Sequence, residues 1–196
     1  MKSKPQTKKI VMGKFKGKSL KLPSCDTTRS SKNIVLESFF NTIQFDIIDS
    51  TFVEVFSGSG SIGLEALSRG ASHVVFMEKG KEALSVLKEN ISQMDPSACR
   101  VFAGNSFSTI HEVLKTLNTE SYFYIDPPFS IREGMEDIYE NMITLIRLIP
   151  TKLVKLIIIE HMTGLKLPQN IGPYKVLKSK KFGKTSLTYL NVGEVE

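Results

Sequence analysis

Apolar and polar residues follow two different periods along this chain. From residue 51 onward, short apolar runs are separated by longer segments whose apolar residues recur every three or four positions. Runs of the first kind predict buried strands, and segments of the second kind predict amphipathic helices. The strands are expected at 52–56, 74–77, 100–103, 122–125 and 153–159, and the helices at 61–69, 81–94, 107–117 and 135–149. This alternation predicts an α/β fold, in which a mostly parallel sheet carries helices on both faces.

The two ends of the chain depart from that order. Residues 10–22 alternate loosely and carry many lysines, which predicts a small basic hairpin, and residues 33–43 have helical spacing. Residues 174–181 and 185–191 read as an antiparallel hairpin that closes the sheet. We therefore expect a tail without fixed structure at 1–9, an extension of hairpin and helix at 10–45, and one main domain at 46–196.

Charge adds a second feature to this picture. The 196-residue chain has a net charge of +6, and its lysines gather near both ends. The first group is Lys2, Lys4, Lys8, Lys9, Lys14, Lys16, Lys18 and Lys21, and the second is Lys175, Lys178, Lys180, Lys181 and Lys184. Clustered cations fit a polyanionic partner, because lysines bound to phosphates release counterions. A merely soluble, lysine-rich surface explains the same charge equally well.

Other classes of protein are disfavoured by what the sequence lacks. No apolar run reaches the roughly 20 residues of a membrane span, and the basic N-terminus has no apolar stretch of signal-peptide type. Cys25 and Cys99 have neither metal-ligand nor redox spacing. We expect a cytoplasmic monomer without a membrane partner.

A glycine-rich loop follows the first strand of the main domain. Gly58 and Gly60 would let the backbone approach a ligand closely, at the carboxyl end of a strand where parallel sheets bind ligands. The spacing Gly58-x-Gly60-x-x-Gly63 formally matches a dinucleotide fingerprint. It admits a nicotinamide or flavin enzyme, a methyltransferase, or a plain tight turn. Its context favours a nucleoside-type cofactor.

Two acids and one amide help to choose among these cofactors. Glu54 precedes the loop and could pair with the cationic amino-acid part of S-adenosylmethionine, whereas it would repel a pyrophosphate. Glu78 ends the second strand, where its two oxygens could accept both ribose hydroxyls. Asn105 follows the third strand, and its amide could bond the adenine edge or equally cap the next helix.

The most informative stretch is Asp126-Pro127-Pro128-Phe129, at the end of the fourth strand. An amino group on a base is a poor nucleophile, because its lone pair is delocalised into the ring. Acceptors at Asp126 and at the carbonyl of Pro127 would hold that nitrogen tetrahedral, and prolines fix such carbonyls in place. Phe129 offers a face on which an extruded base can stack. The sequence therefore predicts methyl transfer to an exocyclic amine of a nucleic-acid base.

No metal is expected, because His73, His111 and His161 are scattered along the chain. A plain turn remains the alternative reading of the four-residue motif. The glycine loop upstream, in the right order, disfavours that reading.

With these motifs in place, the chain resembles the bacterial 16S ribosomal RNA guanine-N2 methyltransferases of the RsmD type over residues 10–190. The resemblance is carried by Gly13 to Lys18, Thr28-Arg29, Glu37 to Asn41, Phe56 to Ala71, Asp126 to Phe129 and Lys181-Phe182-Gly183. It implies a Rossmann-like, seven-stranded methyltransferase sheet over 46–196, whose N-terminal extension helps to grip RNA. It also implies methylation of guanine N2 in the ribosomal RNA of the small subunit.

Site residues follow from the motifs and the resemblance together. Asp126, Pro127, Pro128 and Phe129 are expected at the reacting base. S-adenosyl-L-methionine is expected against Arg29, Glu54, Ser57, Gly58, Ser59, Gly60, Glu78, Lys79, Asn105 and Ser106. The chain departs from the family pattern with Ser30 for Pro, Glu54 for Asp, Ser57 for Ala, Asn105 for Asp and Phe129 for Tyr.

Three alternatives stay open. A DNA adenine-N6 or cytosine-N4 methyltransferase uses the same motif, but it would usually carry a larger target-recognition region than residues 130–135 allow. A dehydrogenase would have no use for Asp126-Pro127-Pro128-Phe129. A non-catalytic RNA-binding protein on the same fold is disfavoured by the intact Gly58, Glu78 and Asp126.

Overall fold

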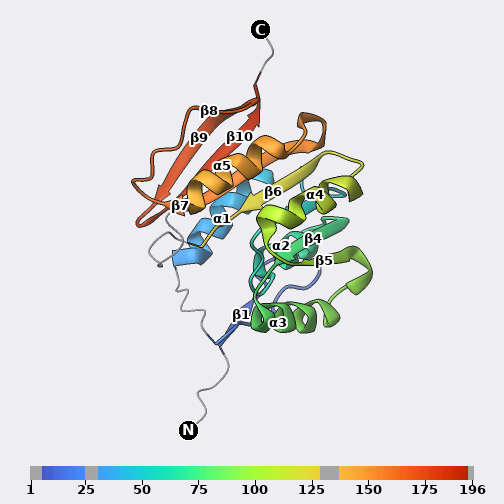
Figure 1. Cartoon of the computed structure of the whole chain (residues 1–196). Helices are drawn as coiled ribbons and strands as arrows, with labels where there is room; N and C mark the ends of the chain where they lie inside the picture. Colours follow the sequence, from blue (N-terminus) through green and yellow to red (C-terminus); the bar gives the residue numbers. More distant parts are fainter. Residues whose placement is uncertain (1–5, 25–30, 129–136, 194–196) are drawn as a thin grey trace.

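A single mixed sheet forms the centre of the molecule in the computed structural model, which describes residues 6–24, 31–128 and 137–193 (Figure 1). Its strands are β3 (Thr51–Glu54), β4 (His73–Glu78), β5 (Cys99–Ala103), β6 (Ser121–Ile125), β7 (Val154–Met162), β8 (Asn170–Ile171), β9 (Tyr174–Phe182) and β10 (Thr185–Val192). They lie in the order β5-β4-β3-β6-β7-β10-β9-β8. Strands β3 to β7 pair in parallel, and β10, β9 and β8 continue the sheet antiparallel. The predicted α/β class and the antiparallel C-terminal hairpin are confirmed.

The strand count differs from the prediction of seven, because the sheet has eight strands. The additional strand is β8, whose two residues pair with the start of β9. A strand of two residues is too short to produce an alternating pattern, so the hydrophobic periodicity gives no sign of it.

Helices cover both faces of the sheet, as the alternation predicts (Figure 1). One face packs against α1 (Ser31–Ile43), α2 (Ser61–Ser68) and α3 (Lys81–Ser92), and the other against α4 (Ser106–Thr116) and α5 (Ile138–Leu148). Two short 3₁₀ helices, Pro96–Ala98 and Thr151–Leu153, precede β5 and β7. Because side chains alternate along a strand, Phe52 of β3 packs into the core beneath α1, α2 and α3, and Val53 packs into the core beneath α4 and α5. Within the described residues, no helix is long and apolar enough to cross a membrane.

A small hairpin of β1 (Thr7–Lys9) and β2 (Ser19–Lys21) precedes the main sheet. It begins at Thr7, inside the segment that we expected to be an unstructured tail. Its first strand reads Thr-Lys-Lys and has no apolar period from which a strand could be predicted. The hairpin is held instead by the protein behind it, since the buried carboxylate of Glu65 accepts hydrogen bonds from the N–H groups of Val11 at 2.8 Å and Met12 at 3.1 Å.

The sheet reverses its winding between β3 and β6. From β3 the chain proceeds through β4 to β5 on one side, whereas β6 and β7 extend the sheet on the other. Ligands of open α/β sheets bind outside the carboxyl ends of the strands at such a switch point. The loop after β3 and the segment after β6 meet at this position, and they carry the two motifs identified in the sequence.

Candidate active site

The glycine loop is shaped by two residues in left-handed backbone conformation, Gly58 at φ 52° and Gly60 at φ 77°. A Cβ on Gly60 would lie 2.3 Å from Cδ1 of Leu87, so the loop packs tightly against α3 at that point. A Cβ on Gly58 would meet nothing within 4 Å. The loop is therefore closed toward the protein at Gly60 and open at Gly58, where a ligand could lie against bare backbone.

Glu54 lies beneath this loop with only 2% of its surface exposed. Its Oε2 accepts a hydrogen bond of 2.9 Å from the N–H of Gly63 in the first turn of α2. Burial raises the pKa of Glu54 from 4.5 to about 8, although the backbone hydrogen bonds of Gly63 and Ile62 oppose that shift. Lys8 of the hairpin favours the charged form, and Asp126 opposes it. A buried carboxyl in this state gains from the arrival of a cationic ligand group.

Glu78 makes the second carboxylate contact with the loop. Its Oε2 accepts the N–H of Gly58 at 2.7 Å, and its Oε1 accepts the N–H groups of Lys79 at 2.9 Å and Gly80 at 2.6 Å. The carboxylate is thus fixed at the carboxyl end of β4, beside the open side of Gly58. A carboxylate has about four acceptor positions, so capacity remains for a ligand hydroxyl. The side chain of Lys79 is exposed to solvent.

Three other polar residues predicted at the cofactor turn their side chains into the protein. The hydroxyl of Ser57 donates to the carbonyl oxygen of Glu54 at 2.8 Å and accepts the N–H of Met77 at 2.9 Å. The hydroxyl of Ser106 donates to the carbonyl oxygen of Val55 at 2.5 Å. Ser59 is buried. The hydroxyls of Ser57 and Ser106 bind neighbouring backbone groups, so a contact of Ser57 with a cofactor would come from its backbone.

Asn105 is the cap of α4, one of the two roles that the sequence leaves open. Its Oδ1 accepts the N–H of Phe107 at 3.1 Å. The side chain remains exposed at the carboxyl end of β5. The cap occupies one acceptor and leaves the amide N–H groups available as donors to an adenine edge.

Asp126 follows directly on the buried end of β6. Glu54 pairs with Tyr124 in the neighbouring strand, so Asp126 lies two residues further toward the open edge than Glu54. Asp126 and Pro128 are half-buried, and Pro127 is buried. The described backbone therefore brings the acidic motif and the glycine loop together at the ends of adjacent strands. Phe129 and Arg29, also predicted at the site, lie outside the described residues.

A buried pair of side chains lies behind Asp126 and was missed in the sequence. The hydroxyl of Tyr124 donates to Oε2 of Glu160 at 2.5 Å, and Glu160 is 1% exposed. Burial, followed by the charge of Glu160, raises the pKa of Tyr124 well above its ordinary value. Glu160 comes directly after the most apolar predicted strand, and an acid in that position was the available signal.

Asn90 of α3 is a second residue that the sequence did not single out. It is completely buried, and its amide bonds the N–H and the carbonyl oxygen of Lys21 at 2.8 and 3.0 Å. The same amide donates to the carbonyl oxygen of Ser59 at 2.9 Å. One side chain therefore joins β2 of the N-terminal hairpin to the glycine loop.

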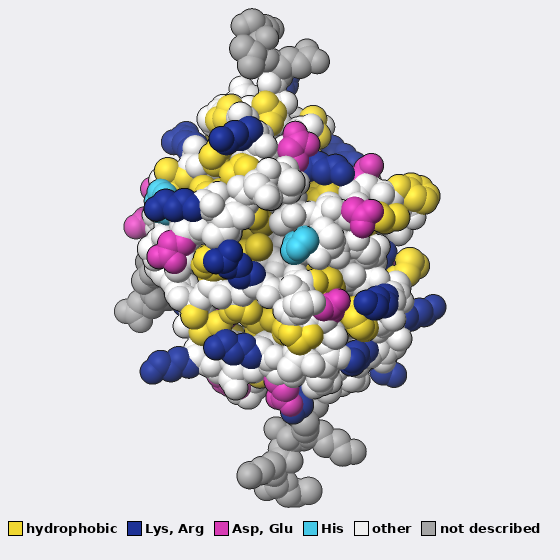
Figure 2. All heavy atoms as spheres, turned by 90° about the vertical axis from the view of Figure 1, so that its right-hand side faces the viewer, with side chains coloured by type: hydrophobic (Ala, Val, Ile, Leu, Met, Phe, Trp, Pro, Cys, Tyr) yellow, Lys and Arg dark blue, Asp and Glu magenta, His cyan; other side chains and the backbone are white. Residues whose placement is uncertain are grey.

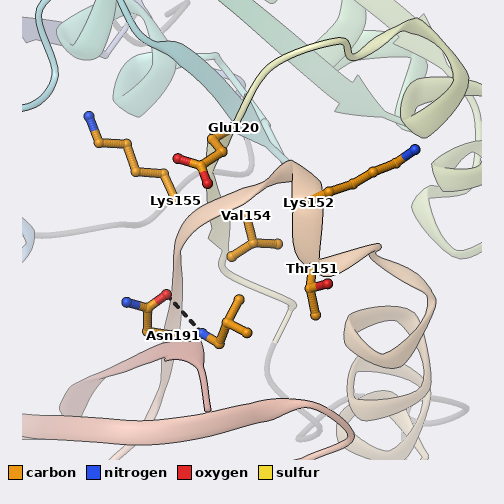
Figure 3. Close-up of a pocket in the computed structure, with 7 residues that line it drawn as sticks. Glu120, Thr151, Lys152, Val154, Lys155 and Asn191 are labelled. Atoms are coloured by element: carbon orange, nitrogen blue, oxygen red, sulfur yellow. Dashed lines mark hydrogen bonds between the residues drawn. The ribbon is translucent and has the colours of Figure 1, made fainter. Parts of the chain in front are cut away.

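A surface pocket lies far from these residues, at the amino ends of β6 and β7 (Figure 3). It is lined by Glu120, Thr151, Lys152, Val154, Lys155, Asn191 and Val192. Figure 3 shows Lys152 and Lys155 extending to opposite sides rather than converging. The rule that ligands bind at carboxyl ends favours the other edge of the sheet. Among the described residues, no group of three or more His, Cys, Asp and Glu is arranged to hold a metal ion.

The chain is similar to known proteins in both sequence and structure. The family model described as Conserved hypothetical protein 95 matches residues 8–191. YlbH of Bacillus subtilis is 26% identical over 183 residues, which cover 91% of this chain and 96% of that protein. Ribosomal RNA small subunit methyltransferase D of Escherichia coli is 30% identical over 127 residues, but this match spans 65% of the chain and only 62% of that protein. The solved structure of YhhF from Escherichia coli has a TM-score of 0.78 and 25% identity, and the match covers 97% of this chain and 100% of that one.

Proposed function

The chain belongs to the family described as Conserved hypothetical protein 95, that of the RsmD-type methyltransferases, and we propose that it methylates ribosomal RNA with S-adenosyl-L-methionine as donor. The finer proposal is that the acceptor is the exocyclic N2 of a guanine in 16S RNA of the small subunit. One observation carries the proposal: Asp126-Pro127-Pro128 and the Gly58–Gly60 loop stand at the carboxyl ends of the adjacent parallel strands β6 and β3. A base amine held by the first would face a methyl donor held by the second.

The residues present fit S-adenosylmethionine. The bare backbone at Gly58 leaves room for the cofactor, and the neighbouring Glu78 carboxylate can accept a ribose hydroxyl. The buried carboxyl of Glu54 suits the α-ammonium group of the methionine part, because a cation there stabilises a charge that burial otherwise opposes. The exposed amide of Asn105 at the carboxyl end of β5 would donate to the adenine edge.

The acceptor side of the reaction follows from Asp126 and Pro127. When bound, the cofactor supplies an electrophilic methyl group on a positively charged sulfur. The carboxylate of Asp126 and the carbonyl oxygen of Pro127 accept hydrogen bonds from the two N2–H groups of guanine. This pulls the nitrogen lone pair out of the ring and toward the methyl carbon. A cofactor bound at the glycine loop would supply the methyl group and keep the electron pair of the broken bond, and the Asp126 carboxylate would take up the amine proton or pass it to solvent. Positioning supplies most of the rate in such a transfer.

A direct test is methyl transfer from labelled S-adenosylmethionine to small ribosomal subunits, to naked ribosomal RNA and to DNA. Label should enter guanine N2 of the RNA. The variant Asp126→Asn should lose more than about 100-fold in turnover while binding the cofactor normally. Transfer to DNA alone would refute the RNA proposal. RNA binding without transfer to any form of RNA would indicate a non-catalytic protein on the same fold.

A further inference from the structure

The C-terminal hairpin carries a group of lysines that the proposed active site does not use. We call Lys178, Lys180, Lys181 and Lys184 the hairpin lysines, since they lie on β9 and in the turn that joins it to β10. Lys178, Lys181 and Lys184 are exposed, and Lys180 is half-buried with its Nζ 3.3 Å from the hydroxyl of Ser38 in α1. Four cations are thus gathered on one short segment.

The sheet register brings this turn to the catalytic edge. Thr185, the first residue of β10, pairs with Met162 at the carboxyl end of β7 on one side and with Phe182 on the other. The turn between them therefore projects from the same edge as Asp126, and in Figure 1 it lies on the side away from the loops that enter β6 and β7. Its backbone is tied to the end of β7, because the N–H of Thr163 donates to the carbonyl oxygen of Lys184 at 2.9 Å.

The separation between the turn and the proposed reacting site suits a nucleic-acid strand. Ser186 of β10 pairs with Lys181 of β9 on one side and with His161 of β7 on the other. Two residues before His161, Ile159 of β7 pairs with Ile125 at the end of β6. The backbone of Lys181 is therefore three strand spacings from that of Asp126, or about 15 Å at about 4.8 Å per spacing. This is a distance that a few nucleotides bridge. A base held at Asp126 would leave its own strand free to run along β7 and β10 toward the turn.

The charges of the hairpin lysines are not balanced by ion pairs within the part of the chain that the structure describes. Within residues 6–24, 31–128 and 137–193, none of the four forms an ion pair with a carboxylate. The face in Figure 2, which is the right-hand side of Figure 1, is different, since basic and acidic side chains are interspersed over it. Uncompensated cations at the edge that holds the reacting residues attract a polyanion to that edge.

We propose that the C-terminal hairpin binds the backbone phosphates of the RNA strand that carries the target base, with Lys181 and Lys184 as its principal contacts. This rests on the proposed function, and it adds a specific docking surface to it. Lysines contribute such contacts without reading sequence, so the hairpin would set the direction of the strand across the sheet. The choice of base would be left to the residues around Asp126.

The test compares two double variants that change the net charge equally. Lys181→Ala/Lys184→Ala removes the proposed contacts. Lys115→Ala/Lys152→Ala removes two exposed lysines from α4 and from the amino edge of the sheet. Affinity for an unmodified transcript of small-subunit ribosomal RNA is measured by filter binding at several salt concentrations, and methyl transfer is measured in parallel.

Loss of two phosphate contacts should reduce the slope of log affinity against log salt by about 1.4, at about 0.7 per contact on single-stranded RNA. At 0.1 M salt this corresponds to roughly 25-fold weaker binding. The hairpin variant should also raise KM for the RNA by a similar factor while its kcat at saturating RNA stays within about twofold. The control variant should lose much less, because it shares only the change in overall charge.

Equal losses in both variants would overturn the proposal, as would a hairpin variant with the affinity and salt slope of the wild type. The binding arm separates this result from a failure of the proposed function. If the wild-type protein transferred no methyl group but the hairpin variant alone lost affinity for RNA, the methyltransferase assignment would fail and the docking surface would stand.

Discussion

Lowering the pH from 8 to 6 should weaken the binding of S-adenosylmethionine, and the buried carboxyl of Glu54 is the reason. Its pKa in the ligand-free protein is raised to about 8, so roughly one molecule in ten carries the carboxylate at pH 7. The proposed contact is between this carboxylate and the α-ammonium group of the cofactor. Binding must then ionise Glu54, and at neutral pH it should release a proton.

The magnitude follows from the change in pKa on binding. An opposite charge within about 4–6 Å lowers a carboxyl pKa by roughly one to three units. With a starting pKa of about 8, and with about half of the ligand's α-amino groups deprotonated at pH 8, a drop of this size makes the dissociation constant at pH 6 about 2-fold to about 20-fold larger than at pH 8. Above pH 8 the affinity should fall again, because an α-amino group loses its proton near 7.7–8.0. The pH profile of affinity is therefore bell-shaped.

Isothermal titration calorimetry in two buffers of different ionisation enthalpy measures both the affinity and the released proton. Glu54→Gln is the matched variant, because an amide oxygen can still accept the N–H of Gly63. It should bind the cofactor more weakly at pH 8, release no proton and lose the acid limb of the profile. A wild-type affinity that is constant between pH 6 and 8, or a variant with an unchanged profile, would refute the pairing.

The same substitution has an effect on stability whose sign is fixed by the direction of the shift. The folded-state pKa of Glu54 lies above the ordinary value of 4.5. Its ionisation therefore costs the folded state nothing below pH 4.5 and progressively more as the pH rises toward 8. At pH 8 the cost approaches about 5 kcal/mol, at 1.36 kcal/mol per unit. In thermal unfolding, the Tm of Glu54→Gln relative to that of the wild type should rise as the pH increases from 4.5 to 8. Equal Tm values for the two proteins at pH 8 would contradict the assigned burial.

Other substitutions test the framework of the site. Asn90→Ala should cost about 1–3 kcal/mol in the free energy of unfolding and weaken cofactor binding, since it removes the side-chain partner of the buried Ser59 carbonyl and of two part-buried backbone groups of Lys21. Lys88→Ala, exposed on the same helix, should do neither. Gly63→Ala places a Cβ 2.5 Å from the ring of Phe76 and should cost about 1–3 kcal/mol, read from urea denaturation. Asn105→Ala should lower the free energy of unfolding by about 1 kcal/mol because it removes the cap of α4. Asn105→Asp should keep both the cap and the stability.

The sequence was sufficient for the elements that obey one period. The parallel strands and the helices that follow them were predicted close to their observed positions. Each helix buries one continuous face and the central strands are buried on both faces, so the apolar residues follow a regular pattern. The short β8 and the strand Thr7–Lys9 escaped prediction for the opposite reason. Their pairing depends on backbone hydrogen bonds to partners distant in the sequence, and their own side chains carry no pattern.

The polar residues of the site were harder to predict than its glycines. Gly58 and Gly60 adopt left-handed backbone conformations that other residues rarely adopt, so their spacing in the sequence was informative. Ser57 and Ser106 were expected to face a ligand, but a hydroxyl serves a neighbouring carbonyl oxygen equally well, and both are used in this way. The type of residue could not distinguish the two uses, because the partner is chosen by the fold.

Four acids show most clearly what the fold adds. Glu54, Glu78, Asp126 and Glu160 each come two residues after a core side chain of the same face, namely Phe52, Phe76, Tyr124 and Ile158. A single rule of strand alternation therefore sends all four toward the carboxyl edge on one side of the sheet. Their environments then separate them: Glu54 is buried against the amide of Gly63, Glu78 is held by three amides, and Glu160 is buried under the hydroxyl of Tyr124. Asp126 is half-buried, as Glu78 is, but Asp126 alone follows the end of its strand. In the proposed function, Asp126 is the one of the four that would meet a base arriving from solvent, while the others would bind the cofactor or support the residues that do.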